Sequence, residues 1–158
     1  MPKTTLISLQ QVKSDFPQFT FKHHEVFHWS PRQNCVYYNA DQLKKNSGFS
    51  QLLHELSHAL LGHTHYGSGV ELLKMETQAW AKAQELASRY DLEINAEQIE
   101  TCLDSYRDWL YLRSSCPNCK SISAEVDSNT YHCFNCLQKW TVPKDQRSRS
   151  YRLKQIEA

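Results

Sequence analysis

Residues 52–61 read Leu-Leu-His-Glu-Leu-Ser-His-Ala-Leu-Leu, an apolar run that contains the pattern H-E-x-x-H. The run predicts a buried helix, on which positions four apart are close neighbours. His54 and His58 can therefore bind one ion, with Glu55 beside it as the general base. This set is typical of a zinc site that lowers the pKa of a bound water to about 7 and polarises a carbonyl, which is the chemistry of peptide hydrolysis. The alternative is an amphipathic helix with two incidental histidines, and a third ligand must decide between them.

The third ligand is predicted on the next helical pattern, from about Val70 to Tyr90. Its apolar residues recur at steps of three and four and form one stripe, which a single carboxylate, Glu76, interrupts. A buried carboxylate is costly unless it is paired or bound to a metal, so Glu76 is the predicted ligand. The alternative is a carboxylate paired with an arginine. Glu71 falls on the polar face of the same helix and is predicted to be dispensable. The stripe consists of Leu72, Leu73, Ala79, Trp80, Ala83, Ala87 and Tyr90.

The other histidines near the motif are not predicted to be ligands. His23, His24 and His28 come before it and have no spacing that relates them to the ion, so they stay unassigned. His63 and His65 follow it closely. The three-histidine pattern H-E-x-x-H-x-x-G-x-x-H would need a glycine at position 61 and a histidine at position 64, and the chain has neither.

The predicted base and ligands resemble those of the gluzincin metallopeptidases, in which a glutamate on the helix after H-E-x-x-H completes the zinc site. Within that group, H-E-L-S-H-A-L-L-G-H at residues 54–63 and E-x-x-A-x-A at residues 76–81 are most similar to the ImmA/IrrE family. The resemblance spans about residues 35–90. It implies a compact intracellular metallopeptidase that acts on DNA-binding regulators. A zinc ribbon after an H-E-x-x-H domain is instead similar to SprT-like proteases, but those use a third histidine.

A second metal site is predicted near the C-terminus, where two C-x-x-C pairs are separated by thirteen residues. Two such knuckles can close a tetrahedral thiolate site without an open position, so this zinc is expected to be structural and the segment to form a zinc ribbon. A redox or disulfide role is the alternative. Cys35 and Cys102 are left as buried apolar residues. The four predicted ligands are Cys116, Cys119, Cys133 and Cys136.

Composition and charge give the broad class of the protein. The chain has 158 residues, 40% of them hydrophobic, which is enough for a globular core. A formal net charge of +1 gives no global reason to expect nucleic-acid or membrane binding. No apolar run is long enough for a signal sequence or a membrane span, so we expect a cytoplasmic protein without a membrane partner. Residues 144–158 are rich in Lys and Arg and either bind phosphates nonspecifically or are merely solvated.

The expected fold is α+β, a small antiparallel sheet packed on helices that carry the H-E-x-x-H site, followed by a small zinc ribbon. The predicted domains are a metallopeptidase domain over residues 1–113, the ribbon over 114–143 and a basic tail over 144–158. Helices are expected over 4–16 and from Ala96 to about Leu112, the second capped by Asn95. Strands are expected between Phe19 and Asn39, with a turn over residues 30–34.

The leading functional hypothesis is an intracellular zinc metallopeptidase that cleaves a protein or peptide substrate, holding one catalytic and one structural zinc ion. The first alternative is a binding module for protein or nucleic acid, built on the ribbon, with an inactive or structural H-E-x-x-H domain. A second alternative is zinc-dependent hydrolysis of a small-molecule amide, since the metal chemistry would be the same.

Overall fold

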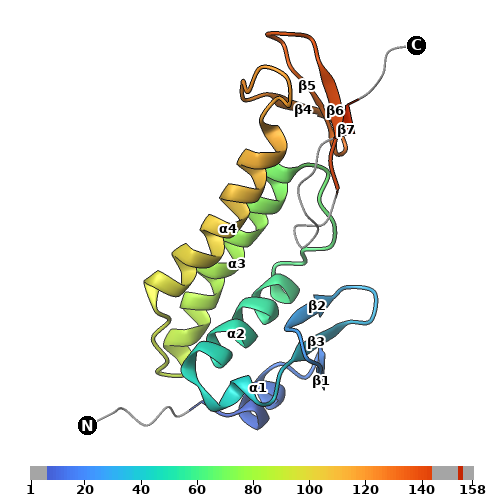
Figure 1. The fold of residues 1–158 in the computed structure, drawn as a ribbon. Coiled ribbons are helices and arrows are strands. Elements are labelled where there is room, and N and C mark those ends of the chain that lie inside the picture. The colour runs from blue at the N-terminus through green and yellow to red at the C-terminus, as the bar shows by residue number, and fades with distance from the viewer. Residues whose placement is uncertain (1–6, 144–152, 155–158) are drawn as a thin grey trace. The chain divides into compact units, whose positions relative to one another are not determined.

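The computed structural model describes residues 7–143 and 153–154 and has the predicted α+β class (Figure 1). It forms two compact units, which are described separately. The first comprises the residues up to His65 together with Met75–Glu100, and the second comprises Tyr66–Lys74 together with the residues from Thr101 onward. The predicted domain boundary after residue 113 does not coincide with this division. Over the described residues, no helix combines the length and the apolarity that crossing a bilayer requires.

In the first unit, helix α1 (Leu9–Asp15) is shorter than the predicted helix over 4–16. Ser8 has an extended backbone, and its side chain accepts a hydrogen bond from the backbone N–H of Gln11 at 3.2 Å, so it is the N-cap and the helix begins after it. Residues 4–6 lie outside the described part of the chain. The hydroxyl of Tyr90 donates to Asp15 at 2.6 Å and ties α1 to the end of α3.

A three-stranded sheet follows, made of β1 (Thr20–His23), β2 (His28–Ser30) and β3 (Cys35–Tyr38) in the order β1-β3-β2. Strands β2 and β3 are antiparallel and joined at the predicted turn. Strand β1 pairs with β3 in parallel, so this sheet is mixed and the expected antiparallel pairing holds for only one of its two ladders. The reason is that β1 and β2 form the two edges of the sheet, and the chain turns back after β2 so that β3 lies between them. Strand β2 is thus an outer strand.

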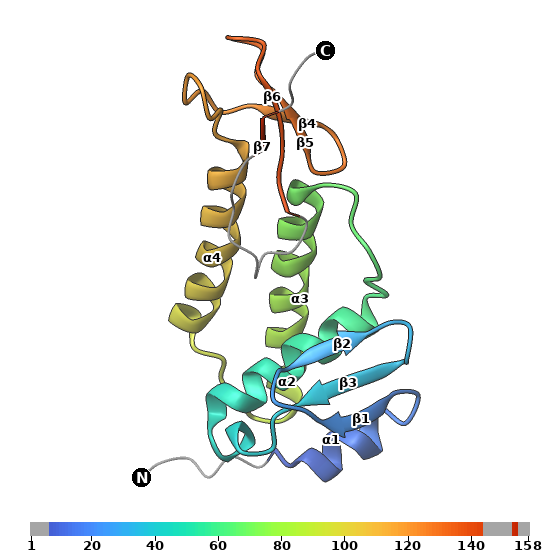
Figure 2. The same cartoon turned by 45° about the vertical axis from the view of Figure 1, so that its right-hand side comes forward.

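Helix α2 (Asn46–Leu60) carries the H-E-x-x-H motif and packs against β2 and β3 (Figures 1 and 2). A short 3₁₀ helix, η1 (Gln42–Lys44), comes before it. A Cβ atom at Gly48 would lie 1.8 Å from the backbone oxygen of Gln42, so only glycine allows this turn to cross the first turn of α2 so closely. The helix ends before Gly62, which has a φ of 68°, as predicted.

Helix α3 (Gly69–Arg89) begins in the second unit and continues into the first. Ser68 accepts a hydrogen bond from the N–H of Glu71, and the carboxylate of Glu71 accepts one from the N–H of Gly67. This arrangement differs from a capping box in one respect, because the glutamate accepts from the residue before the N-cap and not from the N-cap Ser68 itself. The buried face matches the phase of the predicted stripe, with Glu76 buried and Glu71 exposed. Its fully buried members are Ala79, Trp80, Ala83 and Ala87.

Helix α4 (Ala96–Ser114) leads into the second unit, and the side chain of Asn95 accepts a hydrogen bond from the N–H of Glu97, as its predicted cap should. A four-stranded antiparallel sheet follows, in the order β4-β5-β6-β7. Strand β7 belongs to the predicted tail, most of which lies outside the described residues. The strands are β4 (Ala124–Asp127), β5 (Thr130–His132), β6 (Lys139–Thr141) and β7 (Leu153–Lys154).

The core of the second unit is built around two aromatic rings and a buried guanidinium. Tyr131 and Trp140 are cross-strand partners, and their rings stack with centroids 5.5 Å apart. Arg113 is only 1% exposed and donates to Asn129 at 2.8 Å and to the backbone oxygen of Pro143 at 3.1 Å. The guanidinium also lies 3.6 Å from Glu125 and 4.1 Å from the centre of the Trp109 ring. The last turn of α4 is therefore part of the interior of this unit.

Candidate metal sites

Two groups of metal-ligating side chains occur in the described residues, one in each unit. The first consists of His54, His58 and Glu76, and the second of the four C-x-x-C cysteines. In each group the ligand atoms lie within 4.8 Å of one another. Both groups consist of residues that the sequence predicted to bind zinc, and their geometry is compatible with zinc.

In the first group, two helices bring three side chains together. His54 and His58 are one turn apart on α2, and Glu76 faces them from α3. Oε2 of Glu76 lies 2.9 Å from Nε2 of His54, and Oε1 of Glu76 lies 3.0 Å from Nε2 of His58. All three side chains are buried, with at most 8% of each residue exposed. The helical phase predicted for Glu76 therefore places it at the motif, while Glu71 lies in the other unit.

The contact between His54 and Glu76 has a feature that fits a metal ion. Nε2 of His54 and Oε2 of Glu76 are both inaccessible to solvent and lie 2.9 Å apart, and among the described residues neither has a hydrogen-bond partner other than the opposing atom. Converging beside a second imidazole nitrogen, they are the donor set that a divalent cation such as zinc prefers.

The protonation of this group without a metal follows from its neighbours. Burial favours the neutral imidazole, but the carboxylates of Glu55 and Glu76 outweigh it and raise the pKa of His54 to about 9. Burial likewise opposes the ionised form of Glu76, but His54 and His58 lower the pKa of its carboxyl to about 2. A proton held between an imidazole and a carboxylate therefore occupies the place where a cation would bind.

Glu55 lies beside the ligands but is held by a different contact. Its Oε2 accepts a hydrogen bond from the backbone N–H of Trp29 on β2 at 3.0 Å. Its Oε1 lies 3.5 Å from Nδ1 of His54. Glu55 is therefore outside the ligand group, with one oxygen fixed by the sheet and the other beside the ring of His54.

The ring of His54 is held on its flat side as well as at its edge. Trp80 stacks on it with the ring centroids 4.1 Å apart and the planes 9° from parallel. Gln51 lies 3.3 Å from its Nδ1. Because Trp80 is one turn after Glu76 on α3, the same helix supplies both a predicted ligand and the support for another.

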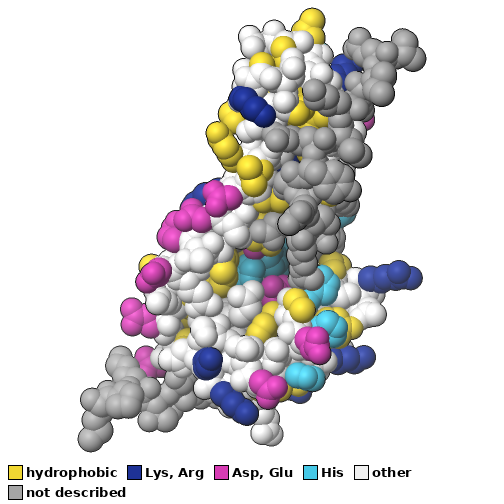
Figure 3. Space-filling view, in the orientation of Figure 1, with side chains coloured by type: hydrophobic (Ala, Val, Ile, Leu, Met, Phe, Trp, Pro, Cys, Tyr) yellow, Lys and Arg dark blue, Asp and Glu magenta, His cyan; other side chains and the backbone are white. Residues whose placement is uncertain are grey.

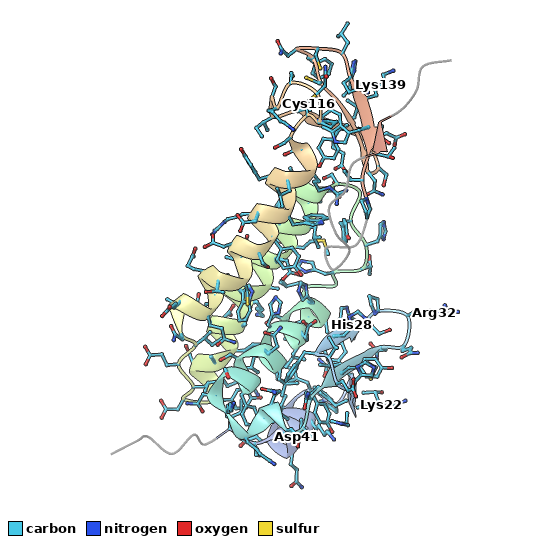
Figure 4. All side chains as sticks on the ribbon, in the orientation of Figure 1. Lys22, His28, Arg32, Asp41, Cys116 and Lys139 are labelled. Carbon is cyan, nitrogen blue, oxygen red and sulfur yellow. The ribbon has the colours of Figure 1, made fainter. Side chains whose placement is uncertain are left out.

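In the second group, the two knuckles have the same backbone geometry. The N–H of Cys116 donates to the oxygen of Ser121 at 2.9 Å, and the N–H of Cys133 donates to the oxygen of Gln138 at 2.9 Å. Lys120 and Leu137 occupy equivalent positions and have φ values of 68° and 65°. Each C-x-x-C pair is thus shaped by its own turn. Figure 4 labels Cys116 where the chain leaves α4.

The sulfur positions fit a tetrahedral zinc ion. Sγ of Cys116 lies 3.5 Å from that of Cys136, and Sγ of Cys119 lies 3.5 Å from that of Cys133. Four Zn–S bonds of about 2.3 Å would place neighbouring sulfurs about 3.8 Å apart. Hydrogen bonds with Ser121 and Asn135 lower the pKa of the Cys119 thiol to about 5, which favours the thiolate that a metal needs.

The remaining histidines of the first unit are not in either group. His23, His24 and His28 are exposed, His28 on β2 as labelled in Figure 4, and histidine side chains are visible on the face shown in Figure 3. His65 is also exposed. His63 is not a member of the ligand group, as predicted, but its Nδ1 lies 2.9 Å from Nδ1 of His58. Sequence reasoning missed this contact, although Gly62 before it was a usable signal.

Comparison of the chain with protein-family models, with curated proteins and with solved structures found no match. The case for a function therefore rests on the residues and their geometry.

Proposed function

We propose that the protein is a zinc metallopeptidase, with His54, His58 and Glu76 as the ligands of a catalytic zinc ion and the four cysteines as the ligands of a structural one. The observation that carries the proposal is the convergence of three buried side chains, with Oε2 and Oε1 of Glu76 facing Nε2 of His54 and Nε2 of His58, next to a carboxylate that is not itself in the group. This arrangement resembles the gluzincin pattern, and the sequence of the motif is similar to that of the ImmA/IrrE family.

When bound, zinc would supply Lewis acidity, which lowers the pKa of a water to about 7 and polarises a substrate carbonyl. The protein's own residues would accept a proton and later donate it. Glu55 has Oε2 held by the N–H of Trp29, so Oε1 is the atom that accepts a proton from the attacking water and returns it to the leaving amine. His54 and His58 cannot turn away, because Trp80 covers the ring of one and His63 contacts Nδ1 of the other.

A peptide is the substrate class that the surroundings favour. Strand β2 is an outer strand of its sheet, and its Trp29 contacts Glu55 directly. An extended peptide can add to such an edge through backbone hydrogen bonds, which would place its carbonyls beside the proposed base. A small-molecule amide could not form these strand-like hydrogen bonds, so the position of β2 supports a peptide substrate over a small-molecule amide.

The proposal is tested with the substitution Glu55→Gln in the full-length chain. Because Glu55 handles protons without ligating, zinc content should stay at two equivalents while cleavage of a fluorescently labelled unfolded protein falls by about 10²- to 10⁴-fold. The matched control is Glu85→Gln, the same change at an exposed position on α3. Equal cleavage by the wild type and Glu55→Gln would refute the assigned base. Absence of cleavage in a wild type that holds two zinc ions would favour the binding-module alternative.

A further inference from the structure

The turn after α2 determines where His63 lies. The N–H of His63 donates to the oxygen of His58 at 3.0 Å, and the N–H of Gly62 donates to the oxygen of Ala59 at 3.2 Å. With Gly62 in the left-handed region, these two bonds form a Schellman motif. In this motif the residue after the glycine folds back over the residue five positions earlier. His63 is therefore brought to His58 by the backbone.

Three contacts hold His63 in this position. Its Nδ1 lies 2.9 Å from Nδ1 of His58, and its Nε2 lies 3.2 Å from Oε1 of Gln78 on α3. Its backbone oxygen accepts a hydrogen bond from the indole N–H of Trp29 at 3.0 Å. In Figures 1 and 2 the end of α2 lies beside β2, which supplies that indole. His63 thus contacts a helix, a strand and a predicted ligand at once.

The direction of these hydrogen bonds follows from the proposed metal site. Glu76 faces Nε2 of His58, so Nε2 is the atom that would bind zinc, and a binding nitrogen carries no proton. A neutral His58 must then carry its proton on Nδ1 and donate it to Nδ1 of His63. His63 in turn carries its proton on Nε2 and donates it to Gln78. In this series of hydrogen bonds each nitrogen is either a donor or an acceptor, and each donated proton has an acceptor.

We propose that His63 is a positioning residue for the metal site, which accepts the Nδ1 proton of His58 and so presents Nε2 of His58 to the ion. The inference rests on the proposed function of His54, His58 and Glu76. It assigns His63 a role outside the ligand set, because its Nδ1 contacts the atom of His58 that faces away from Glu76. Partners of this kind orient the ring of a ligand and increase its basicity, and losing one typically lowers metal affinity about 10- to 100-fold.

The test compares two substitutions that separate the hydrogen bond from the fold. Leucine at position 63 should keep the Schellman motif, because an apolar residue there commonly packs on the helix, but it accepts no hydrogen bond. Asparagine carries Oδ1 at the same point along the side chain as Nδ1 of histidine, so it keeps the acceptor. His65→Leu is the matched control, an exposed histidine outside the chain of contacts. His58→Ala supplies the value for loss of a ligand.

Zinc affinity of the first-unit site is measured by competition with a chromophoric chelator, in full-length chains whose cysteine site remains filled. We expect His63→Leu to weaken zinc binding by about 10- to 100-fold, His63→Asn to stay close to the wild type, and His65→Leu to have no effect. Wild-type affinity in His63→Leu would overturn the proposal. Equal weakening in the leucine and asparagine variants would overturn the hydrogen bond as its cause.

Failure of the proposed function gives a different result. If the wild type takes up zinc only at the cysteines, and His58→Ala changes nothing, the metal site itself is absent and the role of His63 falls with it. Circular dichroism and thermal melting of each variant show whether the fold is kept. Activity is not needed for any of these measurements, so a chain that binds zinc without cleaving a peptide would still decide the role of His63.

Discussion

The two candidate metal sites are assembled in opposite ways. In the second unit each pair of cysteines is set by a local turn, with equivalent backbone hydrogen bonds in both knuckles, and four thiolates leave no position open. In the first unit three candidate ligands come from two helices. A site made by local turns depends on its metal for its fold. A site made by packed helices inherits its geometry from a core that exists without the metal.

The largest effect is expected from a substitution in the cysteine site. Cys116→Ser should remove one zinc equivalent and unfold the sheet of the second unit, because zinc binding supplies about 10–16 kcal/mol in small thiolate domains. Loss of the packed Tyr131–Trp140 pair would appear as a red shift of tryptophan fluorescence. The control is Cys102→Ala, which changes a cysteine outside the group. An unchanged zinc content in Cys116→Ser would contradict the structural role.

The next effect separates the two glutamates of α3. Glu76→Ala should weaken zinc binding at the first-unit site more than 100-fold, since even partners outside the ligand shell are worth about 10- to 100-fold. The fold should persist, because it is built by helix packing. Glu71→Ala is the control, since Glu71 lies in the other unit and its carboxylate accepts a hydrogen bond from Gly67 in the turn before α3. Metal analysis after dialysis compares the two. Retained zinc in Glu76→Ala would move the third ligand elsewhere.

A smaller effect concerns pH. The pKa of His54 is about 9 in the metal-free chain, so at neutral pH zinc must displace a proton from it. Apparent zinc affinity at this site should therefore rise about tenfold for each pH unit between 6.5 and 8.5, and level off as pH passes about 9. Calorimetry in buffers of different ionisation enthalpy measures the released proton. A pH-independent affinity over that range would show that His54 is already neutral.

The smallest effect concerns the start of α3. Glu71→Ala removes the carboxylate that accepts a hydrogen bond from the N–H of Gly67, so the turn before the helix loses that bond. We expect a cost of about 1 kcal/mol in the free energy of unfolding, with zinc content unchanged. Denaturant titration of the zinc-loaded chain gives this value. A loss of stability as large as that of Cys116→Ser would mean that the first turn of α3 is a main support of the second unit.

The sequence was sufficient to predict the features whose structure follows from local spacing or periodicity. The two C-x-x-C pairs predict their knuckles because each turn closes on itself. The phase of the stripe on α3 was read correctly because burial repeats with the helical period, and it separated Glu76 from Glu71. Asn95 and Gly62 were recognisable as helix ends for the same local reason.

The features that were not predicted depend mainly on contacts between residues distant in the sequence. Nothing in β1 indicates that it pairs with β3 in parallel, because strand order is set by which edges remain free after packing. The start of α1 was placed too early, since its apolar spacing extends beyond the Ser8 cap. The role of His63 was missed because a search for ligands does not detect a side chain that contacts only a ligand. The buried Arg113 was not singled out, since its partners become neighbours only in the fold.

Arg113 has a practical consequence for dividing the chain. A fragment ending at residue 113 would keep this guanidinium but lose Glu125, Asn129 and Pro143, which surround it. In the fragment the guanidinium would lie at the C-terminus and be hydrated, but the ring of Trp109, which packs on it in the whole chain, would lose that cover. Such a fragment would therefore be prone to aggregation for a reason unrelated to the proposed metal ligands. A recombinant truncation that cuts there would be mistaken for an inactive protein.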